Sequence, residues 1–247
     1  MIDLNKVKDI PDLVRKAKWL EGKTLAQISQ AIANSDETSR VFTKGSVGYV
    51  VEEGFFGIRK NSEGLPDIPS LGVEVKTCPL KYNWDRTRLT VKEPLSLNII
   101  NYNEEYKCRD LSESSLYQKN RRILFIFYIH DAEKPRSEYV VKYVFLWEMD
   151  AGVLEELEPD YDLILEKIRQ GLAHEIHQDQ HEWLTLCPKH GGDYSDPTDK
   201  KSRRPQPFST IPAEIRAFRL KNSYVNLIMS RYLRKPLGLG GWQIWPN

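Results

Sequence analysis

Three charged residues stand in and just before one strand-like stretch of the chain, PDIPSLGVEVKTCPL at residues 66–80. Apolar and charged residues alternate there, so Glu74 and Lys76 project from one face of the expected strand while the valines enter the core. Asp67 lies before a proline and a glycine, in the bend that leads into the strand. Such a bend can fold Asp67 back beside Glu74.

These residue types suit metal-assisted hydrolysis. Two carboxylates brought this close repel each other unless a cation sits between them. Mg²⁺ is the natural candidate, because it takes a few carboxylate or carbonyl oxygens, keeps waters and leaves room for a substrate phosphate. Lys76 would then hold and help activate an attacking water. The pattern therefore predicts phosphodiester hydrolysis by in-line displacement.

A Glu-x-Lys pattern alone is weak evidence, because Glu105 and Lys107 form a second copy in NEEYK. This copy lacks the apolar strand and the upstream aspartate, which indicates a surface pair. For Glu74 and Lys76 the alternative is a half-exposed strand with a solvated charged face, and the local pattern alone favours that alternative.

Five residues in the C-terminal half raise the question of a zinc site: His174, His177, His181, Cys187 and His190. Their spacing matches no zinc template, and histidines three and four apart on a helix are more often surface or interface residues. We therefore favour Mg²⁺ over zinc as the cofactor.

Composition bounds the class of protein. With 247 residues, 40% of them hydrophobic, the chain can form one substantial core or a domain split into two lobes. A net charge of +1 does not by itself indicate a nucleic-acid partner. The three cysteines fit reduced thiols, and the chain has neither a membrane-span pattern nor a signal-peptide core. We expect a cytoplasmic protein without a membrane partner.

The apolar periodicity predicts the elements that position these residues. Helices are expected at 9–20, at 24–32 with Thr24 and Gln27 as a capping box, and from about Gly45 through Glu52 and Glu53. The segments 71–77, 88–100, 122–130 and 139–149 are expected to form strands of one sheet. A helix from Leu154 to about His181, a strand at 182–187, a polar loop at 188–210 and a helix at 222–233 complete the chain.

The stretch at 66–80 resembles the catalytic segment of the MutH family of DNA endonucleases, which includes mismatch-repair nicking enzymes and Sau-type GATC restriction enzymes. Other segments resemble the family in the same order: LEGKTLAQISQAI, KGSVGYVVEEGFFG, LYQKNRRILFIFY, IRQGLAHEIHQDQHEWLTLCPKHGG and RAFRLKNSYVNLIMSRYL. The resemblance runs from about Leu20 to Leu233, and SLNIINYNEE and RAFRLKNSYV are more similar to the restriction branch.

This resemblance implies an α/β protein with a PD-(D/E)xK restriction-endonuclease-like fold, in which a mixed central sheet is flanked by helices and two lobes surround a DNA cleft. We expect a single MutH-like endonuclease domain over 1–247, with a catalytic lobe at about 20–150 and a DNA-reading lobe at about 151–235.

The resemblance also implies roles for the residues of the catalytic segment. Asp67 and Glu74 match the metal-binding carboxylates, with the backbone carbonyl of Val75 as a further metal ligand, and Lys76 matches the catalytic lysine. Mg²⁺ is the implied cofactor.

Two further catalytic candidates come from neighbouring segments. Glu52 falls where the family has another acidic residue, with Glu53 as its rival, because helical geometry lets only one of the two face the site well. Lys119 matches a basic residue that the family directs into the active site from the next strand. The alternative for Lys119 is a surface lysine beside Arg121 and Arg122.

DNA reading is expected from the other lobe. Pro188 and Lys189 match a turn that enters the major groove, where a lysine can donate to guanine. Arg219 replaces the tyrosine with which the repair branch senses adenine methylation, so this discrimination does not transfer. The basic residues expected to contact DNA in addition are Lys200, Lys201, Arg203, Arg204 and Lys221.

The leading hypothesis is a Mg²⁺-dependent type II restriction endonuclease that cleaves double-stranded DNA, with GATC as the candidate site, and leaves 5′-phosphates. One alternative is a strand-nicking repair endonuclease activated by a partner, and another is a catalytically inactive DNA-binding module. One active site cuts one strand, so restriction needs two visits or a homodimer, transient or stable.

Overall fold

The chain folds into two compact units, each assembled from segments far apart in sequence. The computed structural model describes residues 2–32, 46–58, 64–189, 202–234, 236–237 and 241–242. The first unit comprises Met1–Glu93, Arg122–Glu148 and Asn226–Asn247, and the second comprises Pro94–Arg121 and Met149–Val225. The chain thus passes between units several times, whereas the predicted lobes meet at one boundary near residue 150. That one lobe cleaves and the other reads DNA stays a prediction.

The first unit begins with two capped helices. α1 (Ile10–Ala17) starts at Asp9, whose carboxylate accepts a hydrogen bond of 2.8 Å from the Asp12 N–H. α2 (Leu25–Ile32) starts with the predicted capping box, in which the backbone N–H of Thr24 donates to Gln27 (2.9 Å) and that of Gln27 donates to the Thr24 hydroxyl (3.1 Å). Short 3₁₀-helices flank α1 at Leu4–Lys6 and Lys18–Leu20.

The predicted glycine-bounded helix is present, but most of it has wider turns. After α3 (Ser46–Gly48) the chain forms a π-helix, Tyr49–Phe55, in which the Phe56 N–H donates to the Val51 carbonyl. π-helical turns are rare and often occur at functional sites. Glu52 lies in the first turn of this one.

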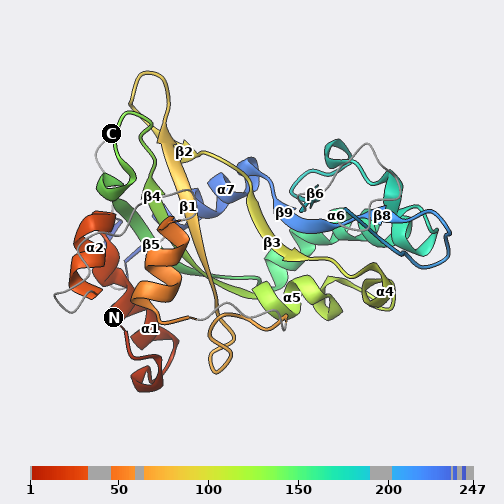
Figure 1. The fold of residues 1–247 in the computed structure, drawn as a ribbon, viewed down its shortest axis with the longest axis horizontal. Helices are drawn as coiled ribbons and strands as arrows, with labels where there is room; N and C mark the ends of the chain where they lie inside the picture. The colour runs from red at the N-terminus through yellow and green to blue at the C-terminus, as the bar shows by residue number, and fades with distance from the viewer. Residues whose placement is uncertain are drawn as a thin grey trace. The chain divides into compact units, whose positions relative to one another are not determined.

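A mixed four-stranded sheet forms the centre of the first unit, in the order β2-β1-β4-β5 (Figure 1). Its strands are β1 (Glu74–Tyr82), β2 (Leu89–Val91), β4 (Arg122–Ile129) and β5 (Val141–Glu148). β1 runs parallel to β4, and the other two pairs are antiparallel. β2 pairs only with Leu80–Tyr82, so no described strand borders the edge of β1 opposite β4 at Glu74 and Lys76.

Different elements pack against the two faces of this sheet. Val75 of β1 and Leu124 of β4 belong to the buried core that α1, α2 and the π-helix complete. On the opposite face Phe125, Phe127 and Phe145 stack on one another. Tyr232, near the end of α7 (Asn222–Leu233), stacks on Phe145 with ring centroids 3.8 Å apart. α7 therefore matches its predicted range and covers the aromatic face.

The prediction of a single sheet is wrong, because the second unit has its own antiparallel sheet, in the order β3-β9-β6. Its strands are β3 (Leu95–Ile99), β9 (Arg216–Leu220) and β6 (Leu184–Pro188). The segment 88–100, predicted as one strand, breaks before β3 at Pro94, which lacks the N–H that a ladder needs. β9 was not predicted as a strand.

The predicted helix from Leu154 to His181 ends earlier. α6 (Ala151–Arg169) stops before Gly171, whose φ is +74° and whose position would bring a Cβ to 2.5 Å from the Phe208 carbonyl oxygen. Only glycine fits there, so the helix cannot continue.

The remaining described elements are short. They are the helices α4 (Tyr102–Glu105) and α5 (Ser115–Asn120), 3₁₀-helices at Leu111–Glu113, Arg136–Glu138, Ala173–Glu175 and Gln178–Gln180, and the strands β7 (Arg203–Arg204), β8 (Ala213–Glu214), β10 (Pro236–Leu237) and β11 (Gly241–Trp242). No helix within the described ranges has the length and apolar character needed to cross a bilayer.

Candidate active site

The bend before β1 is a closed turn. Ile68 and Val73 form a β-bridge with backbone hydrogen bonds of 2.8 and 3.2 Å. Gly72 reverses the chain with a φ of +63°, a conformation that glycine adopts at little cost. This reversal brings Asp67 alongside the start of β1.

Asp67 is hydrogen-bonded to the free edge of β1. Its backbone N–H donates to Glu74 Oε2 (3.1 Å), and the Val75 N–H donates to its Oδ2 (2.9 Å). The N–H and C=O of one residue in an extended strand point to the same edge, so the Val75 carbonyl also points to the edge where Asp67 lies. The structure thus brings together Asp67, Glu74 and the Val75 carbonyl.

Glu74 and Lys76 form an ion pair in which the carboxylate is buried and the lysine is half-buried. Glu74 is only 2% exposed, and Lys76 Nζ lies 2.5 Å from its Oε1. The alternative of a solvated charged face is therefore wrong for Glu74. Burial alone would lower the pKa of Lys76, but the charge and hydrogen bond of Glu74, together with the charges of Asp67 and Glu52, raise that pKa above its ordinary value. Lys76 is held as an ammonium ion.

Glu52 approaches the same cluster from the π-helix. A Cβ on Gly48 would lie 3.4 Å from Glu52 Oε1 and 3.9 Å from Thr77 Oγ1, so this carboxylate lies near β1. Glu52 is also one of the charges that raise the Lys76 pKa. These two observations favour Glu52 over Glu53 as the acidic residue that faces the site.

The position of Lys119 differs from its prediction in two respects. It lies on α5, the helix before β4, and not on the strand itself. It also belongs to the second compact unit, whereas Asp67, Glu74 and Lys76 belong to the first. Its direction into the active site stays a prediction.

The ligands near Asp67 fit Mg²⁺. No group of three or more His, Cys, Asp or Glu side chains among the described residues is arranged to hold a metal, so this site offers two carboxylates. Mg²⁺ commonly binds one or two carboxylates and keeps its remaining positions for water and phosphate. Oδ1 of Asp67 accepts no hydrogen bond from another described residue and is available to such an ion.

The zinc candidates have separate hydrogen-bond partners. His174 Nδ1 lies 2.9 Å from the Gln206 amide nitrogen, and His181 Nδ1 lies 3.1 Å from the His177 carbonyl. Cys187 Sγ lies 3.8 Å from Ser96 Oγ. His190 lies outside the described residues.

A buried aspartate, which the sequence analysis missed, anchors the strand before the predicted DNA-reading turn. Asp160 of α6 accepts hydrogen bonds from the backbone N–H groups of Glu182, Trp183 and Leu184, at 2.8, 2.6 and 2.8 Å. These groups lead into β6, which ends at Pro188. The available signal was an acidic residue on the apolar stripe of α6.

The turn itself begins in a defined position. Pro188 pairs with Arg216 of β9, and the N–H of the exposed Lys189 donates to the Ile215 carbonyl (2.9 Å). Arg216, also missed, is 6% exposed and donates through Nη2 to Glu214 (2.7 Å). Its Nε has no partner among the described residues.

The other residues predicted to contact DNA differ in their secondary structure, burial and hydrogen bonds. Arg203 and Arg204 form β7, which pairs with β8, while Lys200 and Lys201 lie outside the described residues. Arg219 is half-buried on β9, with Nη1 3.5 Å from Gln178 Oε1. The Lys221 ammonium donates to the His181 carbonyl, which ties it to the protein. Their DNA contacts stay predictions.

Comparison with known sequences finds a match over the segment that contains the candidate site. Residues 56–160, which include the Asp67 bend and all of β1, match the family model described as DNA mismatch repair enzyme MutH. The segment that holds Asp67, Glu74 and Lys76 thus matches the MutH family model. The resemblance predicted from the sequence is therefore confirmed.

Relatives of two kinds, a restriction enzyme and mismatch repair proteins, align with most of the chain. The type II restriction enzyme Sau3AI of Staphylococcus aureus is 33% identical over 220 residues, which are 88% of this chain and 42% of the relative. DNA mismatch repair protein MutH of Actinobacillus pleuropneumoniae serotype 5b is 26% identical over 226 residues, 92% of this chain and 95% of the relative. The MutH of Serratia proteamaculans is 25% identical over 222 residues, 89% and 92% of the two chains.

The higher identity to the restriction enzyme agrees with the predicted lean toward the restriction branch. The chain nevertheless spans less than half of that relative's length, 42%.

Proposed function

We propose that this chain is a Mg²⁺-dependent, sequence-specific type II restriction endonuclease that acts in the cytoplasm. It cleaves double-stranded DNA, with GATC as the candidate site, and leaves 5′-phosphates. The observation that carries this proposal is the cluster of Asp67, Glu74 and Lys76 at the free edge of β1. The 33% identity to a restriction enzyme supports the choice of reaction.

The metal ligands would be Asp67, Glu74 and the Val75 carbonyl. A bound Mg²⁺ supplies Lewis acidity toward the scissile phosphate and stabilises negative charge on the leaving oxygen. The hydrogen bonds of Asp67 to Glu74 and Val75 hold the two carboxylates in place before any ion arrives, so little reorganisation is needed.

Lys76 acts as a hydrogen-bond donor in this proposal. Because its pKa is raised, the side chain is protonated at neutral pH and cannot take a proton from water. It can orient the attacking water and neutralise charge on a phosphate oxygen. Glu52 supports this state of Lys76 through its negative charge.

DNA recognition is assigned to the second unit. Lys189 would donate to guanine acceptors from the turn after β6, and Arg219 would contact bases or phosphates from β9. The basic residues proposed as phosphate contacts are Lys200, Lys201, Arg203, Arg204 and Lys221, while Lys119 is proposed as a catalytic residue that reaches into the active site. Pro188 would shape the turn.

Digestion of a supercoiled plasmid tests the proposal. A restriction enzyme converts a plasmid containing GATC to linear DNA in Mg²⁺, as two visits or a homodimer would allow. A repair-type nicking enzyme leaves open circles until a partner protein is added. Sequencing the ends from adenine-methylated and unmethylated phage DNA identifies the site and its methylation sensitivity.

An inactive DNA-binding module is the competing class. It would retain a duplex in Ca²⁺ and leave it intact in Mg²⁺. Cleavage by the wild type, together with loss of cleavage but retention of binding by Glu74→Ala, excludes this class and assigns the reaction to β1.

A further inference from the structure

The hairpin between β1 and β2 presents one side chain almost entirely to solvent. Trp84 at its tip is 94% exposed, the largest value among the exposed large hydrophobic residues of the described chain. Exposing an indole ring to water costs free energy in proportion to its apolar surface area. A single exposed apolar residue is ordinary, so the case for a role depends on how the hairpin is built.

The tip of the hairpin is a well-bonded turn. The backbone N–H of Asn83 donates to the Arg88 carbonyl (2.9 Å), and the Arg88 N–H donates to Asn83 Oδ1 (2.8 Å). Asp85 Oδ1 accepts from both the N–H and the hydroxyl of Thr87, at 3.0 and 2.6 Å. Arg86 has a φ of +59°, an uncommon conformation for a residue with a side chain. These bonds fix the backbone on both sides of Trp84.

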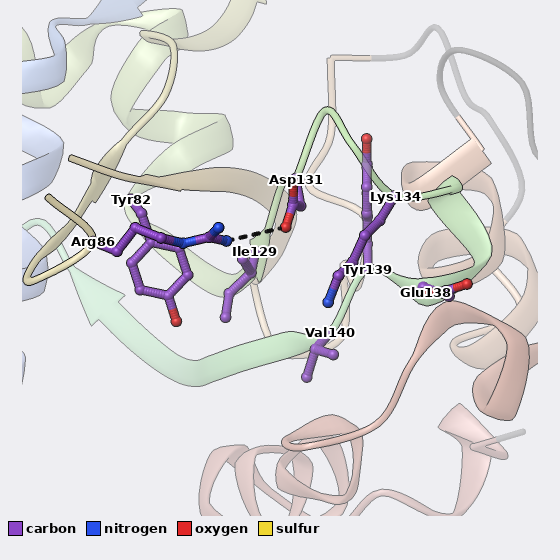
Figure 2. Close-up of a pocket in the computed structure, with 8 residues that line it drawn as sticks. All are labelled: Tyr82, Arg86, Ile129, Asp131, Lys134, Glu138, Tyr139 and Val140. Atoms are coloured by element: carbon purple, nitrogen blue, oxygen red, sulfur yellow. Dashed lines mark hydrogen bonds and ion pairs between the residues drawn. The ribbon is translucent and has the colours of Figure 1, made fainter. Parts of the chain in front are cut away.

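The base of the hairpin is braced against the turn after β4. Figure 2 shows the Arg86 side chain beside the Tyr82 ring and directed toward Asp131, with which it forms an ion pair of 3.3 Å. The cavity at this place has a volume of about 360 Å³ and is also lined by Lys134 and Glu138. The charges of two basic and two acidic side chains balance in this cavity, so it favours neither anions nor cations. The ion pair between Arg86 and Asp131 braces the hairpin at this place.

The charge left at the tip is positive. Lys81, Arg86 and Arg88 bring three positive charges near Trp84, while Asp85 in the turn and Asp131, which pairs with Arg86, bring two negative charges, so one positive charge remains. No carboxylate among the described residues lies within 4 Å of the Lys81 or Arg88 cation, and both side chains are exposed. Cations beside an exposed aromatic ring are the combination that binds nucleic acid, through phosphate contacts and stacking or wedging.

This surface is distinct from the catalytic cluster. Glu74 and Tyr82 are the two ends of β1, eight residues apart, and at about 3.3 Å per residue they are separated by ~26 Å. At 3.4 Å per base pair this length equals about eight base pairs of duplex.

We propose that the β1–β2 hairpin is an accessory DNA-binding element, in which Trp84 and the Lys81 and Arg88 cations contact the duplex outside the cleaved site. This inference rests on the proposed function, because it takes DNA as the substrate. The contact adds affinity for flanking DNA and carries no chemistry. It therefore depends on duplex length and not on the recognition sequence.

Binding to duplexes of two lengths tests the inference. The full chain is titrated in Ca²⁺ with a duplex of about 12 base pairs and with one of about 30 base pairs, both centred on GATC, because only the longer one extends about eight base pairs beyond the cut. Trp84→Ala should weaken binding of the long duplex about tenfold, as expected for loss of one stacked aromatic ring, and leave the short one unchanged. Trp84→Phe should restore most of the affinity.

Charge is tested separately. Arg88→Ala should lower the slope of log affinity against log salt by about 0.9 for the long duplex only. Leu163→Ala, which removes an exposed apolar side chain from α6, and Lys6→Ala, which removes an exposed charge, are the matched controls and should change neither duplex.

Several outcomes overturn the inference. Equal losses on both duplexes, or no loss on either, exclude a flanking contact. A changed sedimentation coefficient of the DNA-free protein on Trp84→Ala would instead assign the hairpin to a protein contact. Wild-type cleavage in Mg²⁺ separates the two proposals: if the wild type cuts DNA while Trp84→Ala binds normally, only the hairpin inference fails. A wild type that neither binds nor cuts overturns both.

Discussion

The Glu-x-Lys stretches that begin at Glu74 and at Glu105 have the same spacing but form different structures. On β1, residues two apart share a face, so Lys76 lies against Glu74. Glu105 ends the helix α4, where residues two apart point to different sides, and Lys107 pairs with Glu104 three residues away (2.7 Å). The strand thus pairs a glutamate with the lysine two residues later, whereas the helix end pairs the lysine with a different glutamate.

Both glutamates are buried, which makes the comparison informative. Glu74 is compensated by a cation and bonded to Asp67. Glu105, 1% exposed, is compensated by neutral donors: the Tyr161 hydroxyl at 3.0 Å and the Ser115 hydroxyl at 2.7 Å. Burial raises the pKa of Glu105 more than these hydrogen bonds lower it. We propose that the first carboxylate holds a metal ion, whereas the second is bonded only to neutral hydroxyl groups of the second unit.

The prediction that Glu105 is a surface residue is therefore wrong. Substitutions at the two glutamates test the difference between the two sites, and the largest loss of cleavage rate is expected at Glu74. Glu74→Ala should reduce the cleavage rate by about 1000-fold or more, equivalent to ~4 kcal/mol of transition-state stabilisation, because a metal ligand is lost. The rate is measured on a plasmid substrate in Mg²⁺. Glu105→Gln should cleave normally, and comparable losses in both variants would remove the distinction.

Removal of the paired cation should have the next largest effect. Lys76→Met keeps the length of the side chain but cannot orient water, so we expect the cleavage rate to fall about 100-fold or more. Single-turnover cleavage reports this step without product release. Lys107→Met is the control, because Lys107 is exposed and pairs with the exposed Glu104; a wild-type rate for Lys76→Met would contradict the assigned role.

Loss of a hydrogen bond to Glu105 should lower the stability of the protein and leave its cleavage rate unchanged. Tyr161→Phe removes a hydroxyl donor from the buried Glu105 and should lower the free energy of unfolding by about 1–3 kcal/mol. Urea denaturation measures this change. Tyr224→Phe removes a similar bond to Glu156 (2.8 Å), a half-buried acceptor, and should cost less. Equal losses would mean that burial of the acceptor does not matter.

The smallest expected effect is a pH dependence. The pKa of Glu105 is raised in the folded chain, so above the ordinary value of 4.5 the folded state binds more protons than the unfolded state, and its contribution to stability falls as pH rises to the folded pKa. Glu105→Gln cannot ionise, so its stability relative to wild type should increase from pH 4 to pH 8. Urea denaturation of both proteins from pH 4 to pH 8 measures this trend, and a constant difference in stability would contradict it.

Local patterns predicted much of the first unit. The Thr24–Gln27 capping box, the strand-like alternation of β1 and the bend at Asp67 each depend on residues close in sequence. The arrangement of Asp67 beside Glu74 follows from a glycine turn and the two-residue repeat of a strand. The two carboxylates themselves suggested Mg²⁺, whereas the assignment of DNA as the substrate came from the family resemblance.

Long-range packing determined the features that the sequence did not reveal. β3 and β9 pair Leu95 with Leu220, and neither segment carries a local sign of its partner. NEEYK has the composition of a surface segment, yet Glu105 is buried by Tyr161, 56 residues away. The end of α6 is different, because Gly171 was a visible stop signal that the apolar periodicity outweighed.

The central claim is that Asp67 and Glu74 together bind a divalent metal ion. Electron paramagnetic resonance titration with Mn²⁺, in the presence of a duplex containing GATC, tests it most directly when wild type is compared with Asp67→Asn. Our account predicts that wild type removes Mn²⁺ from the free-ion signal at about one ion per chain and that Asp67→Asn does not. Equal Mn²⁺ binding by the two proteins would contradict the account.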